Sequence, residues 1–419
     1  MVLKMRKMKD SGIEWIGMIP EGWEVCRLKN IVACHDELRK PISADKRENH
    51  LKLYDYYGAS GVIDTIDDYN VDGTVLLIGE DGANLKLRNL PLIYRASGKF
   101  WVNNHAHILI VNKKYSYDYV AYLLEAGDYS NYITGSAQPK LSQFNLMRFP
   151  VAIPNYTEQE NISFFIHREC SKIDSILSET RSSIEEYKKL KQAVITQAVT
   201  KGVCGEREMK DSGVDWIGEI PKEWTCEKIK YATSISRGLF NHRPRNDERY
   251  YNGKYPFIQT GDVANATKYI VSYSQTLNEL GKAVSKEFPK GTLTMTIAAN
   301  VGDVAILNFD AYFPDSVVGF IPNKNIRTLY LFYVFSAMKD EFTRTAIKST
   351  QLNLNIDRVK ETFIPVTLNV NEQCEIENYL ESKCAEIDGL IAKKEQLVKE
   401  LESYKKSLIY EVVTGKREV

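Results

Sequence analysis

The fold of this chain is decided by a stretch that occurs twice. Residues Met8–Trp23 read MKDSGIEWIGMIPEGW, and residues Met209–Trp224 read MKDSGVDWIGEIPKEW, 201 positions later. Eleven of the sixteen positions are identical, and Ile13 and Val214 are close equivalents. Self-similarity at a fixed long period indicates repeated structural units. The 419 residues are therefore interpreted as two copies of one unit.

A second repeated pattern closes each copy, with a different shift. Thr157-Glu158-Gln159 begins a helical segment that ends at Val199-Thr200-Lys201, and Asn371-Glu372-Gln373 begins one that ends at Val413-Thr414-Gly415, 214 positions later. The middle of the second copy is therefore longer by 13 residues, the difference between 214 and 201. Copies that are alike at their ends and unlike in the middle predict a shared frame that carries two different inserts.

The composition is ordinary for a globular protein and shows no excess of basic residues. Lys and Arg number 55, Asp and Glu number 55, and 43% of residues are hydrophobic. The seven cysteines show neither a CxxC pair nor ligand-like spacing with histidine, which favours reduced thiols in a cytosol. No run approaches the roughly 18 apolar residues that a membrane span needs. We expect a soluble, cytoplasmic protein without a membrane segment.

The end of each copy predicts a long helix. From Ile387 onward, apolar residues at alternating steps of three and four form a heptad seam, which the first copy repeats more weakly. Each helix of about 40 residues would be about 60 Å long. Two alternatives are open: each helix packs on its own globular part, or the two pair antiparallel about a two-fold axis, which would bring the chain ends together. The predicted seam positions are Leu390, Leu397, Leu401, Tyr404 and Leu408 in the second copy and Ile173, Ile176, Tyr187, Leu190 and Val194 in the first.

Each middle predicts a mixed α/β domain. Short β-branched runs at 74–78, 107–111 and 292–297 are typical of strands, and 118–126 and 329–339 are typical of short helices. The predicted fold class is α+β: two mixed α/β domains joined by two long helices that form an antiparallel coiled coil, as a pseudo-two-fold internal repeat. The predicted segments are residues 1–149 and 206–364 for the two mixed domains, and 150–205 and 365–419 for the two helical regions.

The sequence contains no catalytic pattern. It has no GxxxxGK[ST] phosphate loop, no cofactor glycine fingerprint after a strand and no HExxH. Ile153-Pro154-Asn155-Tyr156 lacks the Asn/Asp-Pro-Pro-aromatic order with which amino-methyltransferases hold a flipped base. Asn104-His105-Ala106-His107 places two imidazoles on one face of a strand, but no third metal ligand follows at a suitable spacing. We therefore expect no catalytic residues and no metal site.

The remaining chemistry of both middles is polar and aromatic side chains set among glycines. Arg, Lys, Asn and Gln carry donors and acceptors that match base edges and phosphates, and glycine lets a backbone approach closely. A solvated loop is the alternative for each stretch taken singly, but the concentration of these types outside the helices favours a DNA-binding surface. The candidate DNA-binding residues are Lys86, Arg88, Arg95, Lys99, Trp101, Asn103, Asn104, His105, Gln138 and Lys140 in the first copy, and Arg237, Asn241, His242, Arg243, Arg245, Gln259, Thr260, Asn300, Gln351 and Asn353 in the second.

One loop is retained in both middles. Residues 135–141 read GSAQPKL and residues 349–355 read STQLNLN, so both contain Ser-x-Gln followed by a polar, strand-like step. Such a loop either has a structural role or serves a function that both middles share. Both alternatives remain open from the sequence.

The ordered series of these features resembles the specificity subunit of type I restriction-modification enzymes. The doubled head, the Ser-x-Gln loop, the Glu-Gln step, the Ile-Asp helix at Ile173-Asp174 and Ile387-Asp388, and the Val-Thr ending occur twice in the same order. Together they cover essentially the whole chain. The stretches 79–109 and 257–322 look like two different target-recognition domain types of that family.

The resemblance implies two target-recognition domains, each of which reads half of a split, asymmetric sequence in double-stranded DNA, and a helix pair that sets the spacer. It implies two methyltransferase subunits that methylate adenine N6 with S-adenosylmethionine. It also implies two restriction subunits, motor-nucleases that use ATP and Mg²⁺. The chain itself would be non-catalytic and need no cofactor.

Three other functions stay open. A self-contained nuclease or methyltransferase would modify or cut DNA alone. A sequence-indifferent coiled-coil DNA-binding scaffold would bind all duplexes alike once salt is controlled. The specificity subunit of another split-target restriction system would differ only in its partners.

Overall fold

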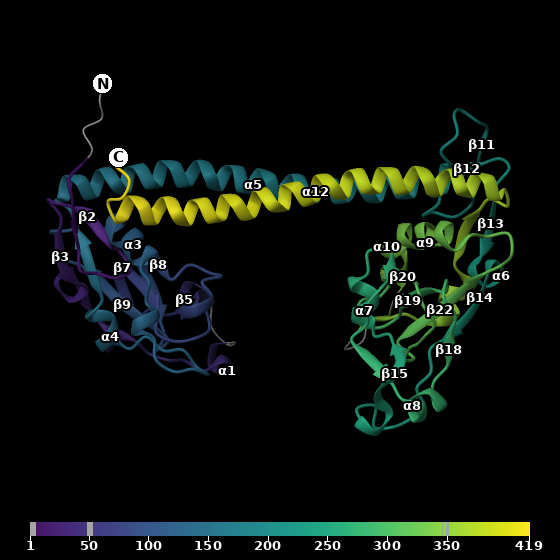
Figure 1. The fold of residues 1–419 in the computed structure, drawn as a ribbon, viewed down its shortest axis with the longest axis horizontal. Coiled ribbons are helices and arrows are strands. Elements are labelled where there is room, and N and C mark those ends of the chain that lie inside the picture. The colour runs from purple at the N-terminus through teal and green to yellow at the C-terminus, as the bar shows by residue number, and fades with distance from the viewer. Residues whose placement is uncertain (1–5, 48–52, 346, 349–351) are drawn as a thin grey trace. The chain divides into compact units, whose positions relative to one another are not determined.

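The structure is a computed structural model, and it describes residues 6–47, 53–345, 347–348 and 352–419 (Figure 1). It contains two compact units: the chain up to Arg181 together with Gln396–Val419, and Ser182–Glu395. Two long helices, α5 (Tyr156–Lys201) and α12 (Val370–Val413), each begin in one unit and end in the other. Each unit therefore contains the head and middle of one copy and a part of both helices.

The two repeated heads fold alike. In the first unit β1 (Met8–Asp10) pairs antiparallel with β2 (Met18–Pro20), with Met8 opposite Pro20. In the second unit β11 (Met209–Asp211) pairs with β12 (Glu219–Pro221) in the same register, with Met209 opposite Pro221. The repeat found in the sequence is thus a repeat in structure.

The second tryptophan of each head anchors it to a long helix. Trp23 and Trp224 are 1% and 0% exposed. The Trp23 indole N–H donates to Glu158 Oε1 (3.1 Å), and that of Trp224 donates to Glu372 Oε2 (2.9 Å). The Glu of each Glu-Gln step therefore ties a head to a helix start, in addition to the packing expected of these core residues.

The Gln of each step ties the helix to the mixed domain. Gln159 Oε1 accepts from the Ser116 backbone N–H at 2.8 Å, and its Nε2 donates to the Pro154 carbonyl at 2.9 Å. Its counterpart Gln373 makes the same two kinds of bond in the second unit, each at 2.8 Å. Both amides are buried, so each satisfies backbone groups that water does not reach.

Replacing either amide by an apolar side chain is expected to destabilise the protein. Gln159→Leu and Gln373→Leu leave buried backbone groups without a partner, which costs about 1–3 kcal/mol of unfolding free energy. Urea unfolding of the two variants measures the loss. Gln396→Leu is the control, because Gln396 is exposed and such surface changes stay within about 0.5 kcal/mol. Buried and exposed variants of equal stability would contradict this role.

The mixed domain of the first unit is built on a six-stranded sheet that packs against α3 (Tyr117–Ala126). Leu76 and Ile78 of the central strand join the core that contains α3, whereas Val75 and Leu77 join a second cluster. Both faces of this strand are therefore buried, which accounts for its continuous apolar run. The strand order is β4 (Val32–Cys34), β9 (Ala106–Val111), β7 (Val71–Gly79), β8 (Ile93–Val102), β5 (Tyr54–Gly58) and β6 (Gly61–Ile66), with only β5 and β8 parallel.

The mixed domain of the second unit shares four strands of this arrangement. Its central strand β19 (Leu293–Thr296) lies between two antiparallel neighbours, as β7 does. The first sheet has the order β14 (Thr233–Arg237), β22 (Val317–Pro322), β19, β20 (Val304–Leu307) and β16 (Tyr269–Ile270). A second sheet has the order β17 (Gln275–Leu277), β15 (Tyr251–Phe257), β21 (Ala311–Tyr312) and β18 (Glu287–Phe288). The middles are thus unlike in sequence and in their outer strands, but alike in their central sheet.

The predicted short helices and strands are confirmed with small changes of bounds. The segment predicted as one helix from 329 to 339 consists of α9 (Thr328–Ala337) and the start of α10 (Lys339–Thr345).

The frame adds the strand pairs β3 (Glu24–Arg27) with β10 (Pro150–Ile153) and β13 (Thr225–Lys228) with β25 (Phe363–Val366). The remaining elements are α1 (Ala44–Arg47), α2 (Asn84–Leu87), α4 (Gln143–Met147), α6 (Ile229–Ala232), α7 (Thr260–Asn265), α8 (Glu279–Ala283), α11 (Ile356–Glu361), β23 (Ile347–Lys348), β24 (Leu352–Asn353) and four 3₁₀ turns, η1 (Leu28–Asn30), η2 (Asp36–Leu38), η3 (Ser130–Tyr132) and η4 (Glu248–Tyr250).

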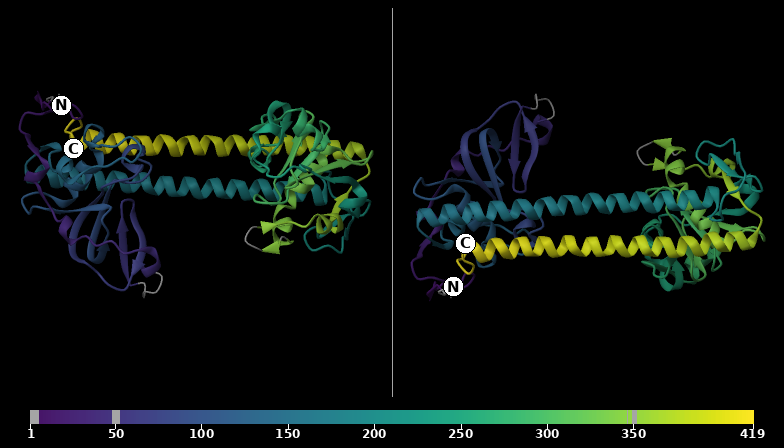
Figure 2. Two further views of the ribbon diagram at one scale, coloured as in Figure 1. Left: turned by 90° about the horizontal axis from the view of Figure 1, so that it is seen from below. Right: turned by 90° about the horizontal axis from the view of Figure 1, so that it is seen from above.

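Within each unit α5 and α12 run antiparallel, which confirms the pairing alternative (Figure 2). In the first unit Lys405 Nζ lies 2.5 Å from Asp174 Oδ1. In the second unit Lys191 Nζ lies 2.7 Å from Asp388 Oδ2. The two pairs are equivalent under the repeat, because both lysines and both aspartates are 214 positions apart. The internal repeat therefore extends to individual ion pairs.

The predicted seam is wrong at every second position. From a shared starting residue the buried positions follow steps of four and three, not three and four. Ile176, Leu190, Leu390, Leu397 and Tyr404 are 36–49% exposed. The seam consists of Ile173, Leu177, Thr180, Ile184, Tyr187, Lys191 and Val194 in α5 and Ile387, Ile391, Lys394, Val398, Leu401, Lys405 and Leu408 in α12, all buried or partly buried.

The two ends of the described chain lie together in the first unit, as predicted. Arg6 and Val419 line the same pocket. Gly415, just past the end of α12, has φ +71°, and a Cβ there would lie 2.5 Å from Pro20 Cδ and 3.1 Å from the Trp23 ring. The turn after the helix therefore requires glycine, both for its backbone conformation and for its close approach to the head.

In the described part of the chain no helix combines the length and the apolar character needed to cross a membrane.

Candidate nucleic-acid interface

Three segments that are far apart in sequence meet beyond the end of β7 in the first unit. The Glu80 N–H donates to the His105 carbonyl (2.8 Å), which joins β7 to the turn between β8 and β9. The Gly82 N–H donates to the Pro139 carbonyl (3.1 Å), and the Leu141 N–H donates to the Glu80 carbonyl (2.7 Å). These bonds bring the Ser-x-Gln loop, residues 135–141, onto the same end of the sheet.

Four of the residues predicted for the first copy lie in exposed positions on this surface: Asn104, His105, Gln138 and Lys140. His105 Nδ1 lies 2.8 Å from Asp81 Oδ2. Lys140 Nζ lies 3.0 Å from Glu80 Oε1, and its side chain is 54% exposed. The structure therefore gathers amide, imidazole and ammonium groups, with two carboxylates, into one polar surface.

Lys86 reaches the same loop from α2, since its Nζ donates to the Gly135 carbonyl at 3.4 Å. Gly135 has φ +82°, and a Cβ there would lie 2.4 Å from the Gln138 carbonyl oxygen. The turn that presents Gln138 is thus one that glycine alone adopts without strain.

Glu80 is the charged centre of this surface. Burial would raise the pKa of its carboxyl, but the side-chain bonds from Arg39 and Lys140 lower that pKa below its ordinary value. Arg39 Nη1 lies 2.6 Å from Glu80 Oε2. Glu80 therefore stays ionised at neutral pH and holds two cations in place.

Three predicted residues of the first copy have their polar groups held inside the fold. The Arg88 guanidinium donates to the carbonyls of Gly127 (2.9 Å) and Glu125, just at the end of α3. Trp101 is 7% exposed, and its indole N–H donates to the Lys40 carbonyl at 2.6 Å. The buried Asn103 amide oxygen accepts the His105 backbone N–H at 2.8 Å. Positions such as these support a surface rather than form it.

Arg95 and Lys99, both on β8, are exposed and sit against aromatic rings. The Arg95 guanidinium lies 4.5 Å from the centre of the Tyr122 ring, and its Nε lies 3.2 Å from Asp118 Oδ1. Lys99 Nζ lies 4.4 Å from the centre of the Tyr69 ring. Among the described residues their contacts are with these side chains and not with the Ser-x-Gln loop.

In the second unit three predicted arginines converge on Asp315. The Arg237 Nε donates to the Asp315 carbonyl (2.5 Å), and Arg245 Nη2 lies 2.6 Å from both carboxylate oxygens. Arg243 Nη2 lies 3.9 Å from Asp315 Oδ2, and its side chain is 56% exposed. Two of these arginines therefore pair with the Asp315 carboxylate, and the third donates to its backbone carbonyl. This arginine cluster is suited to contact phosphates.

The backbone that carries the arginine cluster depends on one glycine. A Cβ on Gly238 would lie 2.2 Å from the Pro314 carbonyl oxygen and 2.4 Å from that of Phe313. Only a residue without a side chain allows β14 to end this close to the segment that carries Asp315.

The other predicted residues of the second copy are dispersed. His242 stacks on Tyr250 with ring centres 3.9 Å apart, and its Nε2 lies 2.9 Å from Asp247 Oδ2. Bonds from Arg249, and to a lesser extent His242, hold the pKa of Asp247 well below its usual range. Gln259 donates to Gln275 Oε1 (2.9 Å), directly before α7, where Thr260 is the first residue. Asn241 and Asn300 are exposed. Gln351 lies outside the described residues, and of Asn353 only the backbone, in β24, is described.

The retained loop has an anchor common to both units. The Leu354 N–H donates to the Ile297 carbonyl (2.8 Å), as the Leu141 N–H does to Glu80. In each case the acceptor follows the central strand of the sheet. This part of the loop is therefore structural, while Gln138 is exposed.

Three charged groups beneath the first surface were not predicted: Asp36, Arg39 and Glu80. Arg39 Nη2 lies 3.2 Å from Asp36 Oδ2, which also lies 2.7 Å from His107 Nδ1. The run of charged residues at 36–40 was the sequence signal that could have indicated Asp36 and Arg39. The residues that they contact are far away along the chain.

The side chains of Cys34, Asp36 and His107 place one potential metal-ligand atom each within 4.8 Å of the others. Hydrogen bonds already account for the carboxylate and the imidazole. Burial and the neighbouring Asp36 raise the pKa of the Cys34 thiol to about 12, which keeps it protonated and a poor metal ligand. The cluster fits a charged hydrogen-bond network better than a metal site.

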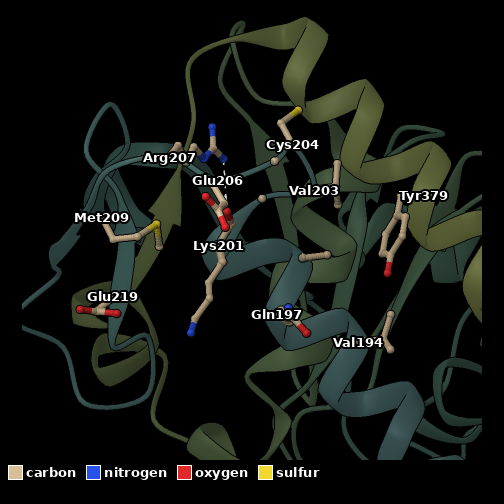
Figure 3. A pocket seen from close by; sticks show the side chains of 13 residues that line it. Val194, Gln197, Lys201, Val203, Cys204, Glu206, Arg207, Met209, Glu219 and Tyr379 are labelled. Atoms are coloured by element: carbon tan, nitrogen blue, oxygen red, sulfur yellow. Dashed lines mark hydrogen bonds between the residues drawn. The ribbon is translucent and has the colours of Figure 1, made fainter.

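The frame itself forms a pocket in each unit. In the second unit a cavity of about 420 Å³ lies between the end of α5 and the head, and Figure 3 shows Gln197, Lys201 and Tyr379 around it. Arg207, also in its lining, pairs with Glu372 at 2.6 Å, and the repeat-equivalent Arg6 pairs with Glu158 at the same distance in the first unit. These contacts repeat the frame and differ from the surfaces formed by the two middles.

Comparison with known proteins agrees with this arrangement. The family model described as "Type I restriction modification DNA specificity domain" matches residues 20–186 and again residues 235–400. A putative type I restriction enzyme specificity subunit of Haemophilus influenzae is 24% identical over 334 residues, which cover 78% of this chain and 80% of that protein. A putative type I restriction enzyme specificity subunit of Methanocaldococcus jannaschii is 24% identical over 433 residues, 96% of this chain and 95% of that protein.

A solved structure supports the fold. A chain from a study of complex assembly and conformational transition of the type I R-M system superposes with a TM-score of 0.70 at 14% identity, and the match covers 95% of this chain and 99% of that chain. One family model matches twice, once in each copy, in agreement with the repeat. The chain belongs to the type I restriction-modification specificity subunit family, whose members recognise DNA.

Proposed function

We propose that the chain recognises a bipartite, asymmetric DNA site, with one mixed domain reading each half. The observation that carries this proposal is that one frame presents two chemically different surfaces. The first unit presents Asn104, His105, Gln138 and Lys140, whereas the second presents the arginine cluster. Equal frames with unequal surfaces favour two different half-sites.

Energetics favour two readers over one. A good bidentate contact to a base gives about 1–3 kcal/mol of discrimination, so a few contacts in one domain select poorly among genomic sites. Linking two readers makes the second contact intramolecular and raises overall affinity without new contacts. The proposed recognition domains are residues 1–149 and 206–364, and the proposed spacer regions are 150–205 and 365–419.

The proposed partners are double-stranded DNA, two methyltransferase subunits and two restriction subunits. The family membership supports such a complex, and the solved chain of similar fold comes from a study of complex assembly in this kind of system. In this proposal S-adenosylmethionine, ATP and Mg²⁺ act in the partners, and the chain serves as a non-catalytic reader and scaffold in the cytoplasm.

A selection experiment separates sequence reading from general DNA binding. The purified chain is equilibrated with a pool of random duplexes at a fixed salt concentration of about 150 mM, because affinity for DNA depends steeply on salt. Enrichment of two short motifs at a constant separation is expected. Recovery of the pool without enrichment would favour the sequence-indifferent scaffold.

A second arm of the experiment addresses catalysis by the chain alone. The same chain is incubated with duplex DNA, S-adenosylmethionine, ATP and Mg²⁺ but without partners. No methylated adenine and no strand cleavage are expected. Either product would support the self-contained enzyme and sink the proposed division of labour.

A further inference from the structure

His107 lies fully buried beneath the Ser-x-Gln loop of the first unit. Its Nδ1 is 2.7 Å from Asp36 Oδ2, and its Nε2 is 2.8 Å from the Leu141 carbonyl oxygen. One imidazole therefore connects η2 to the last residue of the loop, through β9.

Both partners of this imidazole are acceptors, so it must donate twice. A carbonyl oxygen accepts only, and a neutral imidazole donates only once. Asp36 is ionised: burial would raise the pKa of its carboxyl, but the bond and charge of His107, with Cys34 and Arg39, lower that pKa below its ordinary value. Asp36 Oδ1 also accepts the Ile108 N–H at 3.2 Å. The ring that fits this geometry is the doubly protonated imidazolium.

The charges around the ring favour that form. Asp36 faces it from η2 and the Cys34 thiol faces it from β4, and Arg39 bonds both Asp36 and Glu80. Glu80 lies close enough that the charge of His107 contributes to its lowered pKa. Lys140 completes the network from the loop side. Asp36 pairs directly with the buried imidazolium, so the ring is not an isolated buried charge.

The second unit lacks this device at the matching place. Ile78 of β7 pairs with His107 of β9, and Met295 of β19 pairs with Val318 of β22. In both units the carbonyl that accepts the loop leucine N–H lies two residues after this paired residue of the central strand, Glu80 after Ile78 and Ile297 after Met295. Val318 therefore occupies the position of His107. The protonated anchor is therefore a property of the first unit within the described residues.

We propose that His107 is a positioning residue for DNA recognition by the first unit, which in its imidazolium form holds the loop that presents Gln138 and Lys140. This inference rests on the proposed function. A side chain that cannot make both of these bonds should therefore weaken recognition by the first unit, whereas recognition by the second unit should not change.

The test measures discrimination at each half-site separately in the full chain with its partners. Discrimination is the ratio of the Kd for a duplex with that half-site scrambled to the Kd for the intact site, and cross-linked peptides assign each half-site to a unit. In His107→Gln, discrimination at the first unit's half-site is expected to fall about tenfold below the wild-type value. His35→Asn, which removes an exposed imidazole paired with Glu37, should keep the wild-type value.

The outcomes separate this inference from the proposed function. Unchanged discrimination at the second half-site shows that His107→Gln is folded, and if that variant does not fold, Asp36→Asn/His107→Gln replaces it because it also removes the carboxylate that faces the imidazole. A variant with wild-type discrimination at the first half-site overturns the inference alone, and so does an equal loss at both half-sites. A wild-type protein without discrimination at either half-site overturns the proposed function and the inference with it.

Discussion

Four residues inserted after Glu179 in α5 and four after Glu400 in α12 are expected to lengthen the spacer of the recognised site by about one to two base pairs. The two points lie at the same level of the helix pair, because Arg181 bonds Glu402 across it. Four residues add one helical turn, about 6 Å, and a base pair rises about 3.4 Å. Both half-sites should keep their sequences, because neither mixed domain changes.

The affinity for the original site should fall about a hundredfold or more, because only one half-site at a time can then be bound and the intramolecular gain is lost. Selection of duplexes by the variant measures the new spacer directly.

A two-residue insertion at the same points is the matched control. Four residues turn the following seam by about 400°, close to a full turn, whereas two turn it by about 200°. The seam beyond a two-residue insertion, with Lys191 and its neighbours, would therefore face away from the partner helix. We expect that variant to lose recognition of any spaced pair. Changed half-sites with an unchanged spacer in the four-residue variant would contradict the role of the helices.

The second large effect is expected at the arginine cluster. Arg243→Gln/Arg245→Gln removes two of the three positive charges around Asp315. If both contact phosphates, the slope of log K against log salt should fall by about two, and affinity at low salt should fall about ten- to a hundredfold. Titrations at several salt concentrations measure both quantities.

Arg249 provides the control for this prediction. It is 75% exposed and pairs with Asp247, outside the cluster. Arg249→Gln should leave the salt slope as it is, whereas Asp315→Asn should raise affinity because it removes the negative charge that the cluster surrounds. An unchanged slope in the double arginine variant would show that the cluster does not contact DNA.

The frame could be predicted from the sequence because its residues occur twice in the chain. The shared register of the heads and the equal ion pairs Lys405–Asp174 and Lys191–Asp388 follow from the same residues at fixed shifts. The face of each long helix that forms the apolar seam could not be predicted. From Ile387 both the third and the fourth following residues, Leu390 and Ile391, are apolar, so periodicity alone allows two faces. In the structure the face with Ile391 is the less exposed one, whereas Leu390 is 36% exposed.

The candidate interface could be predicted only by residue type. Arg88 and Lys140 look alike as basic residues beside glycines, but the first donates to carbonyls at the end of α3 and the second is half-exposed beside Glu80. The bond between Asp36 and His107 joins residues 71 positions apart, and no local pattern predicts such a contact. Sequence indicates which groups a surface has available, but packing decides which of them remain accessible.

The central claim is that this chain sets a bipartite DNA specificity. Adenine methylation mapped across the genome of the host, with the gene intact and with the gene deleted, tests it most directly. The account predicts that deletion abolishes methylation at one motif made of two short, different half-sites at a fixed separation, and at no other motif. An unchanged methylation map, or the loss of an uninterrupted motif, would contradict it.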